Sequence, residues 1–374
     1  MKRIAAIVGL SALTGGLVAC GGRSVGGEGI VRAEGAVHVV HGAATFPVAA
    51  GTSRQLRAGD QVDVSGGSAV VTLPAGGTLE LRTGSSVRFQ GGPRLEAGDL
   101  LVESSRSAVH VASDMGAVTV AGASRLRRDL AVEVGTYRGV TTVAAARTVI
   151  VPALEEDTVP AVGLVPEPSP LQLHATEPWD ERFLGTAIDL TSQLDSQSSY
   201  VTANTPGGVP HTAAFYRRAL PELGTTPVFT DALLASATPG VAGGVPPPGD
   251  ALVAAAIALS GRGSFSDRWR SVFALRQQGG QWGIVVLDER ADPASVLRLV
   301  GGALDQAVLT PVALTATAVG PAPVATVSPA VVGPATLKPG ATTTVPPSTT
   351  TTHVPRGTKP VSYTHLTLPT ILRV

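Results

Sequence analysis

The chain repeats itself with a spacing of 39 residues, and this repeat limits the folds open to it more than any other feature. Residues 56–60 (LRAGD) superpose on residues 95–99 (LEAGD), and the Ser-Ala-Val at 68–70 superposes on that at 107–109 in the same register. A repeat of this length holds a few short strands and their turns. It therefore predicts structural units that stack on one another and share a core.

Each unit carries a Gly-Asp pair, Gly59-Asp60 in the first and Gly98-Asp99 in the second. Glycine can adopt the positive φ of a tight turn, and an aspartate carboxylate can accept hydrogen bonds from nearby amides. We therefore expect two structural turns, each followed by an outgoing strand, in a roll or sandwich with Val and Leu on its inner face. A metal site at Asp60 and Asp99 is the alternative, but no further carboxylates cluster with them in the sequence.

Residues 30–151 consist of short runs in which apolar or β-branched residues alternate with others, and Gly, Asp and Ser separate the runs. Examples are residues 36–40 (AVHVV), 68–73 (SAVVTL) and 118–120 (VTV). Strand-length runs with turn residues between them are typical of an all-β domain.

These motifs also occur in the order of a known domain. A leucine precedes Gly-Asp at 56–60, a Ser-Ala strand follows at 68–73, a second such turn comes at 95–99, and a closing strand runs over 132–140. In this order the sequence resembles the extracytoplasmic FecR-type domain, the sensor half of iron-dicitrate regulator-like proteins. The resemblance covers residues 30–151 and implies a FecR-like β module that contacts another envelope protein or senses a ligand.

Two departures from that family pattern bear on function. The family's Gly-Thr-x-Phe position reads Gly122-Ala123-Ser124-Arg125-Leu126, and no cytosolic helical segment precedes the expected membrane anchor. A chain held outside the membrane by Cys20 cannot sequester a cytosolic sigma factor directly. Any part in sigma-factor signalling is therefore expected to be indirect.

The first twenty residues predict export and lipid attachment. Met1-Lys2-Arg3 is cationic, and an apolar run follows up to residue 19. This run is shorter than the roughly 20 residues that span a bilayer, so we expect a cleaved signal peptide over residues 1–19. Leu17, Val18 and Ala19 before Cys20 resemble the lipobox of bacterial lipoproteins, which implies a diacylglycerol thioether on Cys20. The alternative is an ordinary signal peptide with an incidental cysteine.

Lipid attachment would also define the location of the protein. Membrane lipid is then a partner through Cys20, residues 20–29 form a Gly/Ser tether, and the rest of the chain is extracytoplasmic. Which bacterial membrane holds it stays open. Cys20 is the only cysteine, so no disulfide can form within the processed chain.

The chain after residue 151 divides by composition into further segments. Residues 152–178 are rich in Pro and Glu and predict a stiff extended linker, and residues 179–309 predict a small α+β module. Residues 310–360 are rich in Pro, Thr and Ala and predict a disordered spacer. The expected fold class is therefore multidomain, with the FecR-like β domain first.

The α+β prediction depends on three patterns. Apolar residues at helical spacing predict a helix over 181–198, and a second helix is expected after Asp292-Pro293. Between them, residues 272–276 (VFALR) and 282–287 (WGIVVL) flank a Gln-Gly-Gly-Gln segment at 278–281, which predicts a β-hairpin.

Residues 361–374 are not expected to belong to the natural protein. Residues 361–366 (VSYTHL) back-translate to a sequence that resembles the transposon mosaic end used in sequencing libraries. Residues 366–370 (LTLPT) continue in the same frame into a sequence that resembles the adaptor after it. The natural chain is therefore expected to continue differently after Pro360.

The sequence carries no recognisable catalytic or cofactor motif. It has no HExxH, Walker or CxxC pattern, and no GxSxG elbow between a strand and a helix. His38 and His41 are three residues apart and would point to opposite faces of a strand, so we expect surface imidazoles and no metal site. The 28 basic and 28 acidic side chains leave no net charge to attract nucleic acid. We therefore expect no catalytic residue, no metal, no cofactor and no nucleic-acid partner.

Three functions remain open from the sequence. The first is a lipid-anchored cell-envelope protein whose FecR-like domain binds a protein or ligand without catalysis. The second is an accessory in trans-envelope signalling, whose partner is a membrane-bound sigma-factor regulator. The third is an unrecognised hydrolase in residues 179–309, which requires a polar pocket there.

Overall fold

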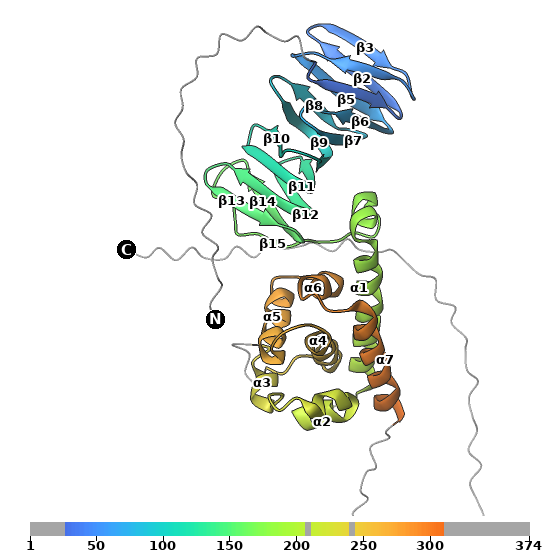
Figure 1. Ribbon diagram of the computed structural model, residues 1–374, viewed down its shortest axis with the longest axis vertical. Helices are drawn as coiled ribbons and strands as arrows, with labels where there is room; N and C mark the ends of the chain where they lie inside the picture. Colours follow the sequence, from blue (N-terminus) through green and yellow to red (C-terminus); the bar gives the residue numbers. More distant parts are fainter. Residues whose placement is uncertain (1–26, 206–210, 239–243, 310–374) are drawn as a thin grey trace, which may run out of the picture. The chain divides into compact units, whose positions relative to one another are not determined.

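The computed structural model describes residues 27–205, 211–238 and 244–309. Strands β1 to β15 come first in the chain and the helices follow them (Figure 1). The expected succession of a β-rich part and a helix-containing part is confirmed.

The strands pair in two series that share three long members, β9 (Pro93–Ser104), β11 (Ala117–Arg128) and β12 (Ala131–Ala144). The first series has the order β4-β1-β6-β7-β9-β11-β12-β14-β15. Its other members are β1 (Gly29–Ala33), β4 (Ser53–Leu56), β6 (Ser68–Thr72), β7 (Gly77–Arg82), β14 (Glu155–Pro160) and β15 (Ser169–Pro170).

The second series has the order β3-β2-β5-β8-β9-β10-β11-β12-β13. Its other members are β2 (Ala36–His41), β3 (Ala44–Val48), β5 (Asp60–Gly66), β8 (Ser86–Phe89), β10 (Val109–Ala112) and β13 (Thr148–Pro152). One core of Val, Leu and Phe side chains lies between the two series, because buried and outward-facing residues alternate along strands such as β5 and β7. Both series contribute to that core, for example Val31, Leu79 and Leu126 from the first and Val39, Val62 and Val118 from the second.

A glycine marks the point where β9 passes from one series to the other. Residues 93–97 pair with β8, whereas residues 98–104 pair with β7 and β11. Gly98 lies at this change with a φ of 81°, and a Cβ there would overlap the backbone of Ser85. The expected turn at Gly98-Asp99 is therefore a bend within a continuous strand, because the chain changes sheet there without reversing direction. Gly59 also has a positive φ, 92°, just before β5.

A pair of glycines lets β11 and β12 bend together. Gly122 lies directly opposite Gly139 in the ladder. A Cβ on Gly122 would overlap the carbonyl oxygen of Arg138, and a Cβ on Gly139, whose φ is 77°, would overlap that of Ala121. Only residues without a side chain fit this crossing.

Part of the segment expected to be a linker, residues 152–178, belongs to the β part. Its β14 pairs with the first half of β12, and β15 pairs with β14. Three of its prolines lie where a strand needs no amide: Pro152 and Pro160 end strands, and Pro170 ends the two-residue edge strand β15. Pro166 and Pro168 lie between β14 and β15, outside the strands. The β part therefore extends to Pro170, beyond the expected boundary at residue 151.

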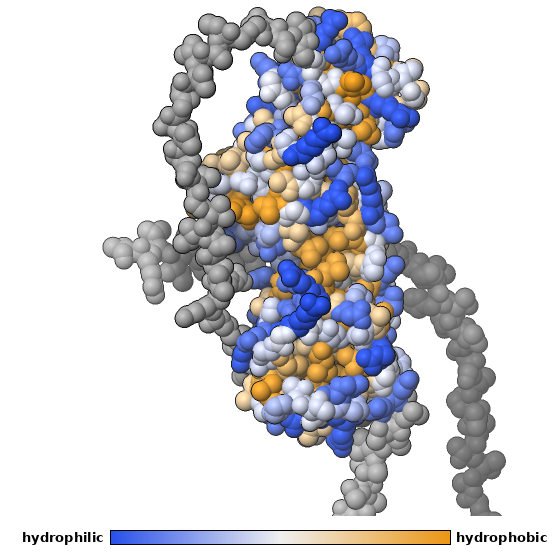
Figure 2. Space-filling model, in the orientation of Figure 1, coloured by the Kyte–Doolittle hydropathy of each residue, from blue (hydrophilic) through white to orange (hydrophobic). Residues whose placement is uncertain are grey.

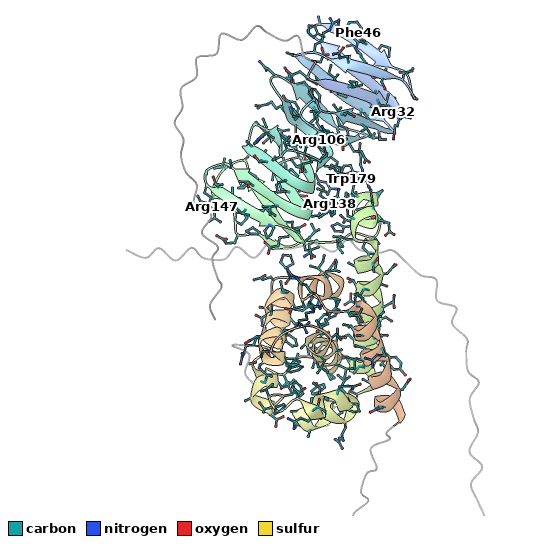
Figure 3. All side chains as sticks on the ribbon, in the orientation of Figure 1. Arg32, Phe46, Arg106, Arg138, Arg147 and Trp179 are labelled. Atoms are coloured by element: carbon teal, nitrogen blue, oxygen red, sulfur yellow. The ribbon has the colours of Figure 1, made fainter. Side chains whose placement is uncertain are left out.

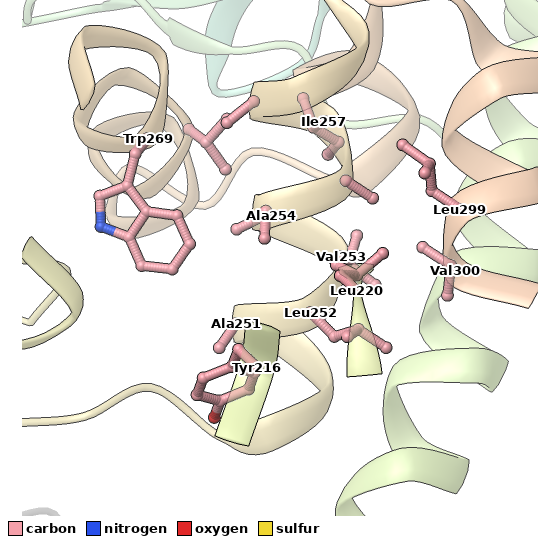
Figure 4. Packing of buried hydrophobic residues seen from close by; sticks show 14 of the residues in the cluster. Tyr216, Leu220, Ala251, Leu252, Val253, Ala254, Ile257, Trp269, Leu299 and Val300 are labelled. Atoms are coloured by element: carbon pink, nitrogen blue, oxygen red, sulfur yellow. The ribbon is translucent and has the colours of Figure 1, made fainter. Parts of the chain in front are cut away.

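The described residues after Pro170 that form secondary structure are helical. The helices are α1 (Pro178–Asn204), α2 (Ala213–Ala219), the short 3₁₀ helix η1 (Pro221–Thr225), α3 (Asp231–Ala235), α4 (Pro248–Ser260), α5 (Phe265–Gln277), α6 (Trp282–Asp288) and α7 (Pro293–Leu309). Helix α4 is buried from Ala251 to Ala258 and packs against α1, α5 and α7 (Figure 4). Tyr216, Trp269 and Val300 belong to the core around it.

The helix expected over 181–198 lies within α1, and α7 begins at Pro293 as expected. The expected hairpin at 272–287 is wrong, because both of its runs are helical, in α5 and α6. Gly279, with a φ of 90°, follows the end of α5 and takes the place of a helix C-cap glycine. Residues 282–286 are buried throughout, so their continuous apolar run reflects a fully packed helix.

Candidate functional site

The expected lipidation site lies outside the described residues. This applies to Cys20 and to Leu17, Val18 and Ala19 before it. The expected spacer at 310–360 and the adaptor-like residues 361–374 also lie outside them.

The first Gly-Asp pair is a fixed turn with a histidine beside it. The carboxylate of Asp60 is buried and accepts a hydrogen bond of 2.8 Å from the backbone N–H of Arg57. Its other oxygen lies 2.6 Å from Nδ1 of His41, whose ring is half exposed, while His38 points to the opposite face of β2. Within residues 27–205, 211–238 and 244–309, no three His, Cys, Asp or Glu side chains form a group that could hold a metal ion.

The aspartate of the second pair lies at the edge of a hollow. Asp99 accepts a hydrogen bond of 2.8 Å from Nε of Arg127, and both residues line a space of about 370 Å³. The floor of this hollow is the face of the first series, where directly paired residues lie side by side. Its two rows are Asp99-Arg127-Glu133-Thr158 and Leu101-Arg125-Gly135-Glu156. The opposite wall is the segment that leads into α1, with Gln172, His174, Glu177 and Trp179.

Arg125 spans the hollow and is hydrogen-bonded on several sides. Its Nη1 donates to both carboxylate oxygens of Asp180, at 2.6 and 2.8 Å. Its Nη2 donates to the carbonyl of Gln172 at 2.9 Å and approaches Glu156 at 3.3 Å. Because residue 135 is a glycine, the Arg125 side chain has room to cross above it. The arginine therefore ties the sheet to the start of α1.

Asp180 is the anchor on the helix side and has no exposed surface. Besides Arg125, it accepts a hydrogen bond of 2.6 Å from the hydroxyl of Tyr137 and one of 2.8 Å from the backbone N–H of His174. A buried carboxylate is stable only when such donors replace its lost water. The position of α1 against the sheet is thus set by charge as well as by packing.

Arg125 and Tyr137 each keep one ionisation state at neutral pH. Burial alone would lower the pKa of Arg125, but the charged groups around it, the carboxylates of Asp180 and Glu156 among them, outweigh burial and raise that pKa. Burial, and then the hydrogen bond to Asp180, raise the pKa of Tyr137, which therefore stays protonated. Burial also raises the pKa of Glu156. A permanently charged arginine and a neutral tyrosine suit a structural joint better than proton transfer.

Trp179 closes the hollow at the start of α1 (Figure 3). Its Nε1–H donates a 2.8 Å hydrogen bond to Glu80, and the guanidinium of Arg82 lies 3.5 Å from the ring centre. Arg182, one turn further along, donates to Glu80 at 3.1 Å and to Glu103 at 2.5 Å. The first turn of α1 is therefore bound to β7 and β9 as well as to β11.

The sequence explains why α1 begins at this point. Glu177 caps the helix, with its side chain accepting from the backbone N–H of Trp179 at 3.3 Å, and Pro178 occupies the first helical position. Asp180 and Glu181 place negative charge in the first turn, where the helix dipole favours it. The anchoring carboxylate is thus also a favourable helix-start residue.

An apolar cluster completes the joint between strands and helices. It contains Leu101, Tyr137, Leu171, Leu173, Trp179, Leu184, Ala187 and Ile284. Beside it, the side-chain amide of Gln281 accepts from the backbone N–H of Leu173 and donates to its carbonyl, both at 3.1 Å. Strands and helices therefore share one hydrophobic cluster and one polar network.

Sequence patterns missed this joint. Arg125 lies in the segment 122–126, which differs from the FecR-type pattern, and Tyr137 lies in the closing strand at 132–140. The difference at 122–126 was the signal in the sequence that could have pointed to Arg125. The hydrolase hypothesis needs a polar pocket within 179–309, but from that range the hollow takes only Trp179. Charged side chains that line the hollow form ion pairs with protein carboxylates, Arg125 with Asp180 and Arg127 with Asp99.

A second surface of the β part differs from the hollow because it carries no charge. It is the outward face of β10, β11, β12 and β13, which we call the uncharged face. Direct pairing places its residues in three rows. The rows are Ala112-Ala117-Ala144-Thr148, His110-Thr119-Thr142-Ile150 and Ala121-Val140-Pro152.

The uncharged face also exposes large apolar side chains. Val140 is 42% exposed and Ile150 is 63% exposed. Figure 2 shows hydrophobic residues gathered over the part of the surface where Figure 1 places β13 and β14. By contrast, the outward face of the first series is covered with paired charges such as Glu103 with Arg138 at 2.8 Å.

Among the helices that the structure describes, none combines the length and the apolar character needed to cross a membrane.

Comparison with known proteins gives few matches. No protein-family model matches the chain, and no curated protein matches it. Two crystal structures of a "putative anti-sigma factor" from Parabacteroides distasonis ATCC 8503, at 1.65 and 2.50 Å resolution, are 19% identical to it over the matched part. Each match covers 29% of this chain and 59% of that one, with TM-scores of 0.27 and 0.26. At these values the likeness concerns part of the fold, and no activity follows from it.

Proposed function

We propose that this chain is a lipid-anchored, extracytoplasmic binding protein of the bacterial cell envelope, which acts by contact and not by catalysis. The observation that carries the proposal is the uncharged face. Its three rows hold no Asp, Glu, Lys or Arg, and Val140 and Ile150 stand exposed on it. Protein interfaces are depleted of charge at their centre, and exposed apolar patches commonly mark them.

The joint at Arg125 and Asp180 supports the same proposal from the other side of the β part. It holds the sheet to α1, so a partner bound to the uncharged face would be held to the helices as well. Rigid presentation of a binding face lowers the conformational cost of binding. The lipid on Cys20 would hold the protein at the membrane, and the uncharged face of the strands would bind the partner.

A role in trans-envelope signalling is the second candidate. The order of FecR-type motifs over residues 30–151 favours it, because that resemblance implies contact with a membrane regulator. In this case the partner on the uncharged face is the extracytoplasmic part of a sigma-factor regulator. The two candidates differ in the identity of the partner and not in the surface that binds it.

Anchoring is tested by Cys20→Ser. We expect this variant to move from the membrane fraction to the aqueous fraction, because the chain has no second cysteine to accept a lipid. Immunoblots of separated fractions measure the change, and Ser24→Ala in the expected tether serves as the control that stays with membranes. A Cys20→Ser protein that remains with membranes would contradict lipid anchoring.

The partner is identified by cross-linking the anchored chain in its native envelope and analysing the captured proteins by mass spectrometry. A membrane regulator in the complex would favour the signalling role. Structural envelope proteins alone would favour a scaffold. Failure to cross-link any envelope protein would count against the binding function itself.

A further inference from the structure

The loop between β14 and β15, residues 161–168, crosses the outer edge of β13, and we call it the strap. Just before β13, Arg147 donates from Nε to the carbonyl of Val165 at 2.8 Å (Figure 3). Just after β13, the carbonyl of Leu154 accepts from the backbone N–H of Leu171 at 2.9 Å. The chain between these two bonds therefore passes along the edge of β13, which is also the edge of the uncharged face.

Few contacts hold the strap in place. Val165 is its only buried residue, whereas Val162 and Leu164 are 90% and 74% exposed. In the described part of the chain, no backbone–backbone hydrogen bond involves the strap. Glu167 pairs with Nη2 of Arg147 at 2.9 Å, but both side chains are exposed, and such pairs contribute little to stability. A segment with these properties opens locally more readily than the strands around it.

A buried carboxylate on β14 has no partner for one of its oxygens. Asp157 is 4% exposed and points toward the β core, as Val159 two residues further along the strand does. Its Oδ1 accepts a hydrogen bond of 2.7 Å from the backbone N–H of Thr158. Its Oδ2 is buried and has no hydrogen-bond partner among the described residues. A buried charge without donors is costly, so ionisation of Asp157 destabilises its present surroundings.

The charged groups that act on Asp157 belong to the strap and to the turn that holds it. Arg147 favours the ionised carboxylate, Glu167 opposes it, and the directly paired residue on β12 is the apolar Val134. Arg147 binds Val165 and Glu167 and makes no hydrogen bond to Asp157. Burial is the largest influence and raises the pKa of Asp157.

We propose that the strap is a pH-sensitive cover, which stays closed while Asp157 is protonated and opens more often once Asp157 is ionised. Opening would admit water to the unpartnered oxygen and so relieve the cost of its charge. The closed form therefore holds the Asp157 proton more tightly than the open form. Closure is strongest below the ordinary aspartate pKa of about 4, and it weakens as the pH rises through the raised pKa of the closed form.

Opening of the strap would change the surface beside the uncharged face. It would uncover the outer edge of β13 next to Ile150, which is 63% exposed. The uncharged face would then gain an accessible edge at neutral pH that it lacks at acid pH. This inference goes beyond the proposed function, because the movement of the strap requires no partner.

The test measures how often Val165 becomes accessible, as thiol reactivity in the full chain carrying Cys20→Ser and Val165→Cys. The introduced thiol is then the only one in the protein. Its rate of reaction with a pyridyl disulfide is followed from about pH 4 to about pH 8. Val162→Cys in the same background is the matched control, because residue 162 is 90% exposed and reports only the chemistry of thiol and reagent. We expect the ratio of the two rates, residue 165 to residue 162, to rise at least about threefold with pH.

Two further variants assign the pH dependence to one carboxylate. Asp157→Asn keeps the shape of the side chain and removes its titration, so the ratio should no longer change with pH. Glu167→Gln removes the other carboxylate, which is 83% exposed, and most of the pH dependence should remain. A ratio that stays constant with pH when Asp157 is present, an unchanged dependence in Asp157→Asn, or loss of the dependence in Glu167→Gln would each overturn the proposal.

Nuclear magnetic resonance provides a readout that needs no substitution in the strap. Titration of the carboxyl carbon of Asp157 should give a pKa above the ordinary aspartate value, and a pKa at or below that value would also overturn the proposal. A strap that stays closed at every pH, in a chain that still captures an envelope partner, would refute the pH-sensitive cover alone and leave the proposed function standing.

Discussion

Asp180→Ala is expected to destabilise the protein by about 3–5 kcal/mol, the cost of leaving a buried charge without its partner. Asp180 has no exposed surface, and its loss leaves the guanidinium of Arg125 and the hydroxyl of Tyr137 without their acceptor. Guanidinium unfolding of the purified chain measures the change.

Asp267→Ala is the control for this prediction. Asp267 forms an ion pair of 3.4 Å with Arg270 on α5, with both side chains largely exposed, and such surface pairs contribute about 0–1 kcal/mol. Equal losses in the two variants would contradict the structural role of the Arg125–Asp180 joint. Asp180→Asn retains the shape of the side chain without its charge, and a loss close to that of alanine would locate the effect in the charge.

Gly139→Ala is expected to destabilise the β part by about 2–5 kcal/mol, through positive-φ strain and a forced shift of the neighbouring backbone. Gly139 has a φ of 77°, and a Cβ there would overlap the carbonyl oxygen of Ala121. The bend that carries β12 between the two series depends on this close approach.

Gly51→Ala separates the two causes. Gly51 has a φ of 80°, and no atom lies within 4 Å of the position its Cβ would take. We therefore expect Gly51→Ala to lower the free energy of unfolding by about 1–2 kcal/mol, from positive-φ strain alone. If thermal or guanidinium unfolding shows the same loss for both variants, the crossing of β11 and β12 does not depend on the missing side chains.

The strands were predictable because their signal is local. Alternation over runs such as 36–40 and 118–120 records which side chains face the core, and β2 and β11 contain these runs. The helices at 181–198 and after Asp292 were predictable for the same reason, since their apolar stripes have helical spacing. Each of these elements buries one face, so its period is visible in the sequence.

The hairpin prediction failed where the sequence has no period. Residues 282–286 are buried on all sides, and a short run of apolar residues does not distinguish a buried helix from a buried strand. The linker prediction failed because proline composition does not show whether a proline stands inside a strand or at its end. Pro152 and Pro160 stand at ends, where they cost no ladder hydrogen bond.

The candidate sites were hidden for a different reason. Arg125 and Asp180 are 55 positions apart, and no sequence motif contains both of them. The uncharged face arises only when β10, β11, β12 and β13 lie side by side, so its lack of charge is a property of the pairing and not of any one segment. Contacts of this kind depend on the register of distant strands.

The measurement that tests the proposed binding surface most directly is capture of envelope partners by the anchored chain carrying Thr142→Arg. Thr142 lies in the central row of the uncharged face, opposite Thr119 and Ile150, whereas the control residue Thr45 is exposed on β3, outside that face. If the uncharged face binds the partner, Thr142→Arg should abolish capture and Thr45→Arg should leave it intact. Undiminished capture by a folded Thr142→Arg protein would contradict binding through this face.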